Sequence, residues 1–403
     1  MTAIRKHGAK EGDSRARHPP RHGGWPATRG MLAVLPPAWL GRPARLLRRL
    51  TGIRLGCVRD YACGPVGLRA GEGVLFPALG VMLLDADPDR LAALRPVSLA
   101  IQPNRRVRGL GALPGEFTDT EQAAWGLRAT GVPDSALTGR GARVAILDSG
   151  IDSGHADFRN RPLVTRAFDG TADARDEHGH GTFCAGIACG PRVPDAGPRY
   201  GIAADASLYI AKVLGASADG TDASVLAAID WAVQMQCDVV SLSVGCVVGD
   251  DEPCAAVYEQ AAARALEAGT LLVAPAGNRS QRPDLIAPVE SPANCSDIVA
   301  VGAVGPDLGI AAFSNGQVRG SAGEVDLVAP GVAIHSASLS SDPYAVFSGT
   351  SMAVPFVAGI AALLVEADPT ARGARLRDRL RQRARPVAAA RADAGAGLVQ
   401  VEG

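Results

Sequence analysis

The sequence lacks both a net charge and any long apolar run. Its 41 basic residues balance 41 acidic residues over 403 positions, so nothing favours nucleic acid or an anionic membrane as the main partner. No stretch reaches about 18 uninterrupted apolar residues, and no membrane span is predicted. The first apolar run, Met31 to Leu40, is broken by Pro36 and Pro37, which makes it a poor core for a secretory signal. The missing signal favours an intracellular location over secretion.

Cysteine is scarce as well. Eight cysteines are too few for a disulfide scaffold, and none of them shows the paired CxxC spacing of a zinc site. Cys246 and Cys254 flank a short acidic loop and could pair in an oxidising compartment. Free thiols in or near a core are the alternative. We expect neither a bound metal nor a cofactor.

The pattern along the chain changes twice and defines three zones. Residues 1–55 carry little ordered pattern, and a disordered or loosely packed leader is expected there. Residues 56–110 predict a small unit that is too small for a core of its own and should dock on the rest. Its predicted elements are a strand at Leu79–Leu84, a helix from Asp85 to Arg95 and a strand at Val97–Ile101. Beyond a joint rich in glycine and proline, the third zone extends from residue 115 to 403.

Short apolar runs of β type alternate with helical patterns in the third zone. Within Val225–Val233, the apolar side chains share one face at helical spacing. Alternating strands and helices predict an α/β fold, a three-layer sandwich in which a mainly parallel sheet is covered on both faces. The predicted strands are Val144–Leu147, Leu208–Val213, Val239–Val244, Leu271–Ala274 and Ile298–Val304.

Two short motifs in this zone carry a carboxylate and an imidazole. In VAILDSGID, Asp148 closes a buried strand, and the carboxyl ends of parallel strands form the edge where ligands bind. A turn or cap aspartate is the alternative. In DEHGHGTFCAG, His180 falls at a helix start between glycines. His178 is the competing imidazole, but the glycine-flanked setting favours His180.

Two further motifs carry a hydroxyl and an amide. In FSGTSMAVPFVAG, Ser351 would open a helix with Pro355 in its first turn, and Ser348 is the alternative N-cap. In LLVAPAGN, a strand ends at Gly277-Asn278. The Asn278 amide could donate a hydrogen bond to an oxyanion, although an asparagine after glycine is also a common turn residue. Serine hydrolysis needs these four groups: a hydroxyl, an imidazole base, an orienting carboxylate and oxyanion donors.

Together the strings DSGID, HGHGTFCAG, APAGN and GTSMAVPFVAG resemble the four signature blocks of subtilisin-like serine peptidases. The chain order Asp, His, Ser is also the order of that family. The resemblance extends from about Trp125 to Val399. It implies a serine endopeptidase in which Asp148 orients His180, His180 takes the Ser351 proton, and Asn278 stabilises the oxyanion with the Ser351 N–H.

The resemblance also implies a substrate groove that pairs a polypeptide as an extra strand. Glu290 aligns with the floor of the primary specificity pocket, where a carboxylate would favour Arg or Lys before the cut. A loop glutamate facing solvent is the alternative. The implied substrate-binding residues are Gly220, Thr221, Asp222, Ser243, Val244, Gly245, Pro275, Ala276, Gly277 and Glu290.

The second zone resembles the later half of the inhibitory propeptide of these enzymes, so the expected partners are polypeptide substrates and the chain's own propeptide region. Its end near Arg105–Arg108 is the expected self-processing region, and we expect a monomer. Such a propeptide is typical of exported enzymes, which opposes the intracellular location favoured above. Asp157 matches one ligand of a calcium site of many relatives, but the remaining ligand run is missing at Gly190–Pro198. Cys184, one turn after His180, matches the thiol-bearing branch of the family.

Two rival functions are compatible with these residues. An esterase or lipase would use the same triad but needs a GxSxG turn, whereas Ser351 lies in GTSMA. A catalytically inactive subtilase used as a binding module would be expected to lack a triad member or the asparagine, and all four are present.

Overall fold

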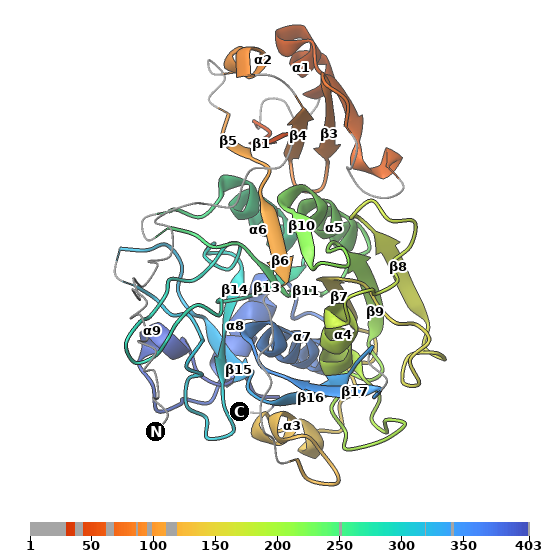
Figure 1. Ribbon diagram of the computed structural model, residues 1–403, viewed down its shortest axis with the longest axis vertical. Helices are drawn as coiled ribbons and strands as arrows, with labels where there is room; N and C mark the ends of the chain where they lie inside the picture. The colour runs from red at the N-terminus through yellow and green to blue at the C-terminus, as the bar shows by residue number, and fades with distance from the viewer. Residues whose placement is uncertain are drawn as a thin grey trace, which may run out of the picture.

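The computed structural model describes residues 30–36, 43–61, 68–85, 88–94, 99–109, 119–249, 252–318, 320–339 and 342–401. A small unit between residues 30 and 103 lies on one end of a larger α/β unit that occupies residues 119–401 (Figure 1). The extended segment that follows the small unit runs down onto the larger one.

The small unit is a five-stranded sheet with two helices on its outer face. Its strand order is β2-β3-β4-β1-β5, with one parallel pair, β2 and β3. Side chains alternate across the sheet: Val81 and Leu83 face the larger unit, whereas Met82 and Leu84 face the helices. Its elements are β1 (Met31–Val34), α1 (Pro43–Thr51), β2 (Arg54–Cys57), the 3₁₀ turn η2 (Val58–Asp60), β3 (Glu72–Phe76), β4 (Val81–Asp85), α2 (Pro88–Ala92) and β5 (Ile101–Pro103).

This sheet corrects the predicted leader. Met31–Val34 pairs with both β4 and β5 in the middle of the sheet, and Leu47 of α1 is fully buried against it. The small unit therefore already includes the described residues from Gly30 onward and does not start at residue 56. The predicted strand at Leu79–Leu84 is confirmed as β4, whereas the second predicted strand lies later, at β5. Residues 1–29 of the predicted leader lie outside the described residues.

The larger unit is built on a seven-stranded sheet in which every neighbouring pair is parallel. The strand order is β15-β14-β13-β11-β7-β9-β8. The strands are β7 (Arg143–Asp148), β8 (Leu163–Ala167), β9 (Ser207–Lys212), β11 (Val239–Leu242), β13 (Leu271–Pro275), β14 (Val299–Val304) and β15 (Leu327–Pro330). All five strands predicted in this zone are present, and the run predicted as Val239–Val244 is interrupted at Ser243.

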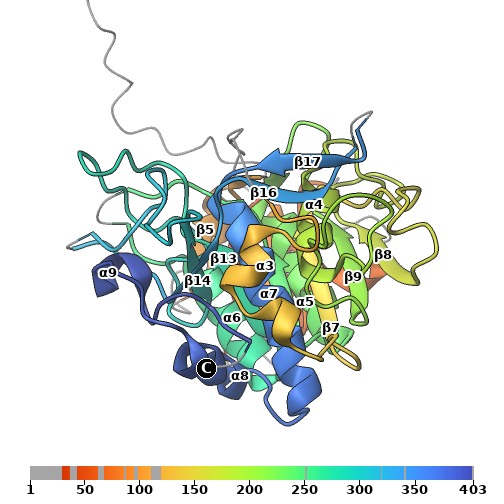
Figure 2. The ribbon, with the colours of Figure 1, turned by 90° about the horizontal axis from the view of Figure 1, so that it is seen from below.

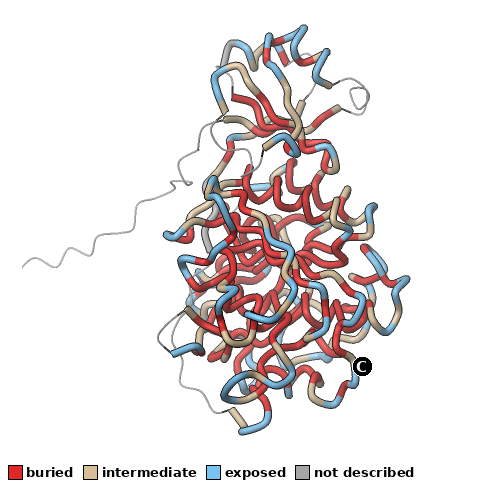
Figure 3. Tube along the Cα trace, turned by 90° about the vertical axis from the view of Figure 1, so that its right-hand side faces the viewer, coloured by how far each residue is buried: buried red, intermediate tan, exposed pale blue. Residues whose placement is uncertain are grey.

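Helices cover both faces of this sheet and complete the three predicted layers (Figure 2). Successive residues of β7 alternate between the two cores: Val144 and Ile146 face one, and Ala145 and Leu147 face the other. The helices are α4 (His180–Cys189), α7 (Thr350–Ala367) and α8 (Ala374–Arg383) on the first face, and α5 (Asp222–Gln234) and α6 (Ala256–Glu267) on the second. Buried residues form a continuous interior between the layers (Figure 3).

Helix α7 is the central element of the first core. It is apolar and long enough to cross a membrane, but 89% of it is buried inside the protein. The remaining elements are β6 (Arg106–Gly109), β10 (Asp219–Thr221), β12 (Val244–Gly245), the hairpin β16 (Ile334–Ala337) and β17 (Tyr344–Phe347), the helices α3 (Trp125–Ala129) and α9 (Arg391–Ala394), and the 3₁₀ turn η4 (Val132–Asp134).

The small sheet packs on α5 and α6 of the larger unit. Phe76, Leu79 and Val81 belong to the same buried cluster as residues of these two helices. In addition, the Ala78 N–H donates a 2.7 Å hydrogen bond to the buried Asp230 carboxylate of α5. The small unit thus buries its inner face by docking, as predicted, but it also has a small core of its own beneath its helices, which was not predicted.

Candidate active site

Asp148 and His180 form a buried pair at the carboxyl edge of the sheet. Asp148 is the last residue of β7, and His180 is the first residue of α4. The imidazole Nδ1 lies 2.8 Å from both carboxylate oxygens of Asp148. Burial alone would lower the pKa of His180, but the charge and hydrogen bond of Asp148 outweigh it and raise this pKa well above its usual value. The carboxylate therefore holds the ring orientation and stabilises its protonated form.

The competing imidazole, His178, lies two residues outside the helix. Its ring centre is 6.2 Å from that of His180, and the exposed side chain has no contact with Asp148 among the described interactions. Of these two histidines, His180 is the one that contacts the Asp148 carboxylate.

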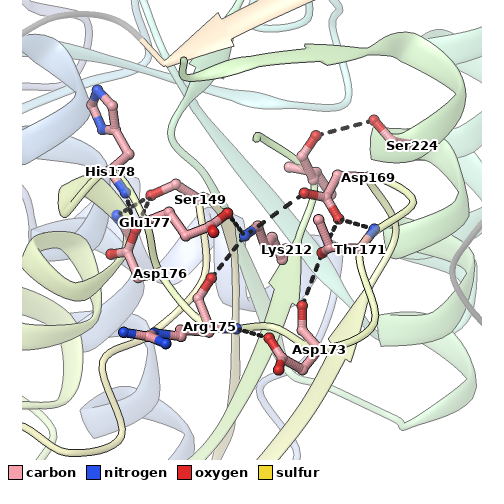
Figure 4. Close-up of polar contacts among 12 residues, drawn as sticks. Ser149, Asp169, Thr171, Asp173, Arg175, Asp176, Glu177, His178, Lys212 and Ser224 are labelled. Carbon is pink, nitrogen blue, oxygen red and sulfur yellow. Dashed lines mark hydrogen bonds and ion pairs between the residues drawn. The ribbon is translucent and has the colours of Figure 1, made fainter. Parts of the chain in front are cut away.

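Asp176, which sequence reasoning missed, holds the start of α4 (Figure 4). Its carboxylate accepts hydrogen bonds from the Gly179 N–H, from both the N–H and the hydroxyl of Thr182, from the His178 N–H and from the Ser149 hydroxyl. Burial would raise the pKa of Asp176, but these hydrogen bonds lower it. Asp176 lies three residues before the N-cap of α4, which is Gly179, so the usual N-cap preference for aspartate does not point to it.

A buried lysine ties the loop before α4 to the sheet. Lys212 ends β9 and is the register partner of Asp148. Its ammonium donates to the Arg175 carbonyl at 2.8 Å and to the Glu177 carboxylate at 3.0 Å, and it lies 3.8 Å from Asp169 (Figure 4). The loop that presents His180 is therefore fixed from both ends.

Ser351 lies in the first turn of α7, at the positive end of the helix. Pro355 stands one residue past the predicted first turn, and its ring nitrogen cannot donate to the Ser351 carbonyl. That carbonyl is satisfied instead by the Ser243 hydroxyl at 3.2 Å and the Cys184 thiol at 3.7 Å. The Cys184 sulfur also lies 3.9 Å from His180 Nδ1, so one thiol contacts both residues.

Ser348, the alternative in the same motif, has a structural role. Its hydroxyl accepts a 2.8 Å hydrogen bond from the Ala333 N–H in a buried site, and the N-cap of α7 is Gly349. The hydroxyl of Ser348 therefore supports the preceding loop.

Asn278 follows β13 through Gly277, whose φ of +114° suits only glycine. The Asn278 side-chain oxygen accepts hydrogen bonds from the N–H and the hydroxyl of Thr350, at 2.8 and 2.9 Å. These bonds fix the orientation of the amide. Its nitrogen is buried and has no hydrogen-bond partner among the described residues, which leaves the donor available beside Ser351.

Three short strands form a separate sheet at this edge. β6 is the middle strand and pairs antiparallel with both β10 and β12. Val107 lies opposite Gly220, and Arg108 lies opposite Gly245. Strand β6 thus lies between β10 and β12, which contain residues that the sequence predicted to bind substrate.

Glu290 is buried, and the solvent-facing alternative is wrong. Only 2% of it is exposed, and a Cβ added at Gly277 would lie 2.8 Å from its carboxyl carbon, which places Glu290 beside one of the implied substrate-binding residues. Burial raises the pKa of Glu290 to about 7, against the opposing effects of Arg279 and Asn315. Neither carboxyl oxygen has a hydrogen-bond partner that meets normal geometry within the described residues.

Comparison with known proteins agrees with this geometry. The model of the subtilase family matches residues 139–399, which cover the paired Asp148 and His180, Asn278 and Ser351. This chain belongs to the subtilase family.

Individual relatives support the same assignment. Alkaline elastase YaB of Bacillus sp. (strain YaB) is 32% identical over 332 residues, 81% of this chain and 80% of the elastase. Subtilisin E of Bacillus subtilis (strain 168) is 34% identical over 254 residues, 63% of each protein. A solved structure of a cold adapted subtilisin-like serine proteinase matches with a TM-score of 0.59 at 28% identity, covering 70% of this chain and 99% of that one. The subtilase is a serine-type endopeptidase with the predicted three-layer fold.

The cysteines of this subtilase differ from the suggested pairing. Cys254 forms a disulfide with Cys295, 41 residues further along the chain, whereas Cys246 is a buried free thiol. The disulfide joins the loop before α6 to the loop that carries Glu290. Cys184 and Cys189 are also free and buried.

Asp157 matches a calcium ligand of other subtilases. In this chain both of its carboxylate oxygens accept hydrogen bonds from protein groups. One carboxylate oxygen accepts hydrogen bonds from the hydroxyls of Tyr200 at 2.5 Å and Tyr344 at 3.0 Å. The other accepts from the Asp195 N–H at 2.8 Å. Burial raises the pKa of both tyrosines, that of Tyr344 to about 12, so both hydroxyls remain donors. These surroundings do not fit a calcium site.

Replacing Asp157 should therefore destabilise the subtilase without any dependence on calcium. We expect Asp157→Asn to lower the free energy of unfolding by about 1.5–3 kcal/mol, the usual contribution of hydrogen bonds to a charged group. Thermal melts with calcium and with a chelator should show the same difference from wild type. Tyr344→Phe, which removes one donor, is the matched control. A wild-type melting temperature that falls on chelation, with no such fall in Asp157→Asn, would contradict this account.

Proposed function

We propose that this subtilase cleaves polypeptides with Ser351 as nucleophile, His180 as general base and Asp148 as the residue that orients and stabilises the imidazole. The observation that carries the proposal is the buried Asp148–His180 pair, with its two 2.8 Å contacts. The Nδ1 atom of His180 faces the Asp148 carboxylate, so Nε2 is the ring nitrogen that can take a proton from Ser351. That nitrogen is buried and has no partner of normal geometry among the described residues.

The oxyanion that forms during attack would be stabilised by Asn278 and by the Ser351 N–H. Support comes from the Asn278 amide nitrogen, which lacks a partner in the described part of the chain although it is buried. Because Thr350 fixes the amide oxygen, the donor is oriented before substrate arrives. A donor that is already oriented needs no reorganisation when charge develops.

The small unit and β6 would act together as an inhibitory propeptide. β6 lies where a substrate strand would pair, between β10 and β12. Its register places Gly109 opposite Val244, and one further residue along the chain would face Ser243, whose hydroxyl contacts the Ser351 carbonyl. The bond after Leu110 is therefore the proposed self-processing site, slightly later than the Arg105–Arg108 region. Leu110 itself lies outside the described residues.

Glu290 would make the specificity pocket sensitive to pH. Because burial raises its pKa to about 7, the carboxyl group is neutral below that pH and charged above it. A neutral pocket accepts an apolar residue such as Leu110, whereas a charged pocket favours Arg or Lys before the cut.

Digestion of a mixed peptide library at pH 6 and pH 8 tests this proposal, with cut sites read by mass spectrometry. We expect the share of cuts after Arg and Lys to rise about 10-fold at the higher pH. A hydrogen bond to a buried charged group changes binding by roughly this factor. Glu290→Gln, which keeps the shape but cannot ionise, should show the same cut sites at both pH values. Ser351→Ala serves as the blank. Identical apolar cut sites for wild type at both pH values would contradict the role of Glu290.

A further inference from the structure

Arg105, the residue just before β6, places its guanidinium in a pocket of the larger unit. Its Nε donates to the Asp222 carboxylate at 3.0 Å, and its own backbone N–H donates to the same oxygen at 3.0 Å. The two terminal nitrogens reach Ser291 Oγ at 3.0 Å and the Glu252 carboxylate at 3.2 Å. Only 15% of the arginine side chain is exposed.

The pocket is assembled from three separate segments. Asp222 is the first residue of α5, Glu252 precedes α6, and Ser291 follows Glu290. A forked guanidinium can bind all three segments at once, which a lysine ammonium cannot do with the same geometry. The site therefore matches the shape of arginine as well as its charge.

Asp222 depends on this arginine for its charge balance. Its side chain is fully buried, and its other oxygen accepts a 2.9 Å hydrogen bond from the Tyr258 hydroxyl. Burial raises the pKa of Asp222, and Arg105 opposes that effect. Once the propeptide leaves, the Asp222 carboxylate would lose both its cation and the strand that covers it, and would face the open groove as an acidic group. The released enzyme would thus bind another cation of similar shape at this position.

The strand register places the pocket relative to the scissile bond. Thr221 lies opposite Arg106, and the Asp222 N–H donates to the Arg105 carbonyl at 2.8 Å, so the pairing continues to Arg105. With the cut after Leu110, Arg105 is the sixth residue before the bond. Figure 1 shows β6 leaving the small unit and running beside β10 toward the carboxyl edge of the main sheet.

We propose that Asp222, Glu252 and Ser291 form a subsite for an arginine side chain six residues before the scissile bond. In the full chain this subsite holds Arg105 and so anchors the inhibitory strand. After processing it selects polypeptide substrates that carry arginine at the same position. The inference rests on the proposed function, because it uses the same groove and the same direction of binding.

Peptides based on residues 104–115 of the chain test this subsite with the self-processed enzyme. We expect kcat/KM to fall about 10- to 100-fold when Arg105 of the peptide becomes Ala, as for the loss of a buried charged hydrogen bond. Replacing Arg105 of the peptide with Lys should cause most of the same loss in kcat/KM. The peptide in which Arg106 becomes Ala removes the same charge one position later and should change kcat/KM less than about threefold. Asp222→Asn and, if that variant does not fold, Ser291→Ala should reduce the preference for Arg over Ala measured within each enzyme.

The outcomes separate this inference from the proposed function. A shorter peptide of residues 107–115 lacks the arginine and reports on the triad alone. Cleavage of that peptide together with equal cleavage of the Arg and Ala peptides would overturn the subsite and leave the peptidase intact. An arginine preference that persists unchanged in both enzyme variants would overturn its location. If wild type cleaves none of the peptides, the proposed function and the subsite both fail.

Discussion

Ser351→Ala should abolish proteolysis and leave the full-length chain intact during expression. Without the hydroxyl, His180 has no nucleophile to activate, and removal of the equivalent serine from subtilisin itself lowers turnover by about 10⁶-fold. Wild-type protein should lose its first 110 residues or so by cleavage of its own chain, whereas the variant should keep its full mass of 41.3 kDa. Intact-mass spectrometry and a peptide assay measure the two effects on the same preparations.

Ser348→Ala is the matched control for this experiment. It removes a buried serine hydroxyl three residues earlier on the chain, and that hydroxyl binds only the Ala333 N–H among the described contacts. We expect a modest loss of stability, about 1 kcal/mol, with processing and peptide cleavage retained. Equal activity of Ser351→Ala and wild type would favour an inactive subtilase that acts as a binding module.

Asn278→Ala should lower kcat by about 10²–10³-fold with little change in KM. The magnitude is that of the corresponding donor in subtilisin itself. The physical reason is that the amide nitrogen has no ground-state partner among the described residues, so its hydrogen bond forms only when the oxyanion develops. Steady-state kinetics on one peptide substrate measure both constants.

The alanine variant also removes the acceptor for Thr350 and could disturb the start of α7. Asn278→Asp separates the two effects, because it keeps an oxygen for the Thr350 N–H and hydroxyl but cannot donate to an oxyanion. We expect the same loss of kcat in both variants. A loss of less than tenfold in both would show that Asn278 is a turn residue without a role in the oxyanion site.

The main sheet could be predicted from the sequence because its strands are buried on both faces. Runs such as Val144–Leu147 are apolar at every position, and the structure places alternate residues in two different cores. The candidate site residues could also be picked out from the sequence, because glycines around His180 and before Asn278 and Ser351 indicate tight backbone turns. Each of these motifs is a short run of neighbouring residues, so its chemistry can be predicted without knowing the fold.

The small unit could not be delimited in the same way. Helix α1 is rich in arginine, with basic residues at Arg48 and Arg49 in its last turn, and its local sequence resembles a solvated basic stretch. Leu47 is buried because α1 packs against the small sheet. Local patterns do not show which distant segment will cover an apolar side chain.

Long-range contacts explain what the local motifs could not show. Cys254 pairs with Cys295 across 41 residues, whereas the sequence suggested only the nearer Cys246 as a possible partner, with free thiols as the alternative. The burial of Glu290 likewise depends on Gly277 and its surroundings, and the role of Arg105 depends on Asp222, which lies 117 positions away. The sequence contained these residues but no local signal that they would meet.

Stoichiometric labelling with a serine-directed sulfonyl fluoride tests the central claim most directly. The self-processed enzyme should take up one adduct per chain, located on Ser351 by peptide mass mapping, and His180→Ala should lose the label because the hydroxyl is no longer activated. Ser348→Ala should still be labelled at Ser351. Labelling at another serine, or equal labelling of Ser351 in the His180→Ala variant, would contradict the proposed triad.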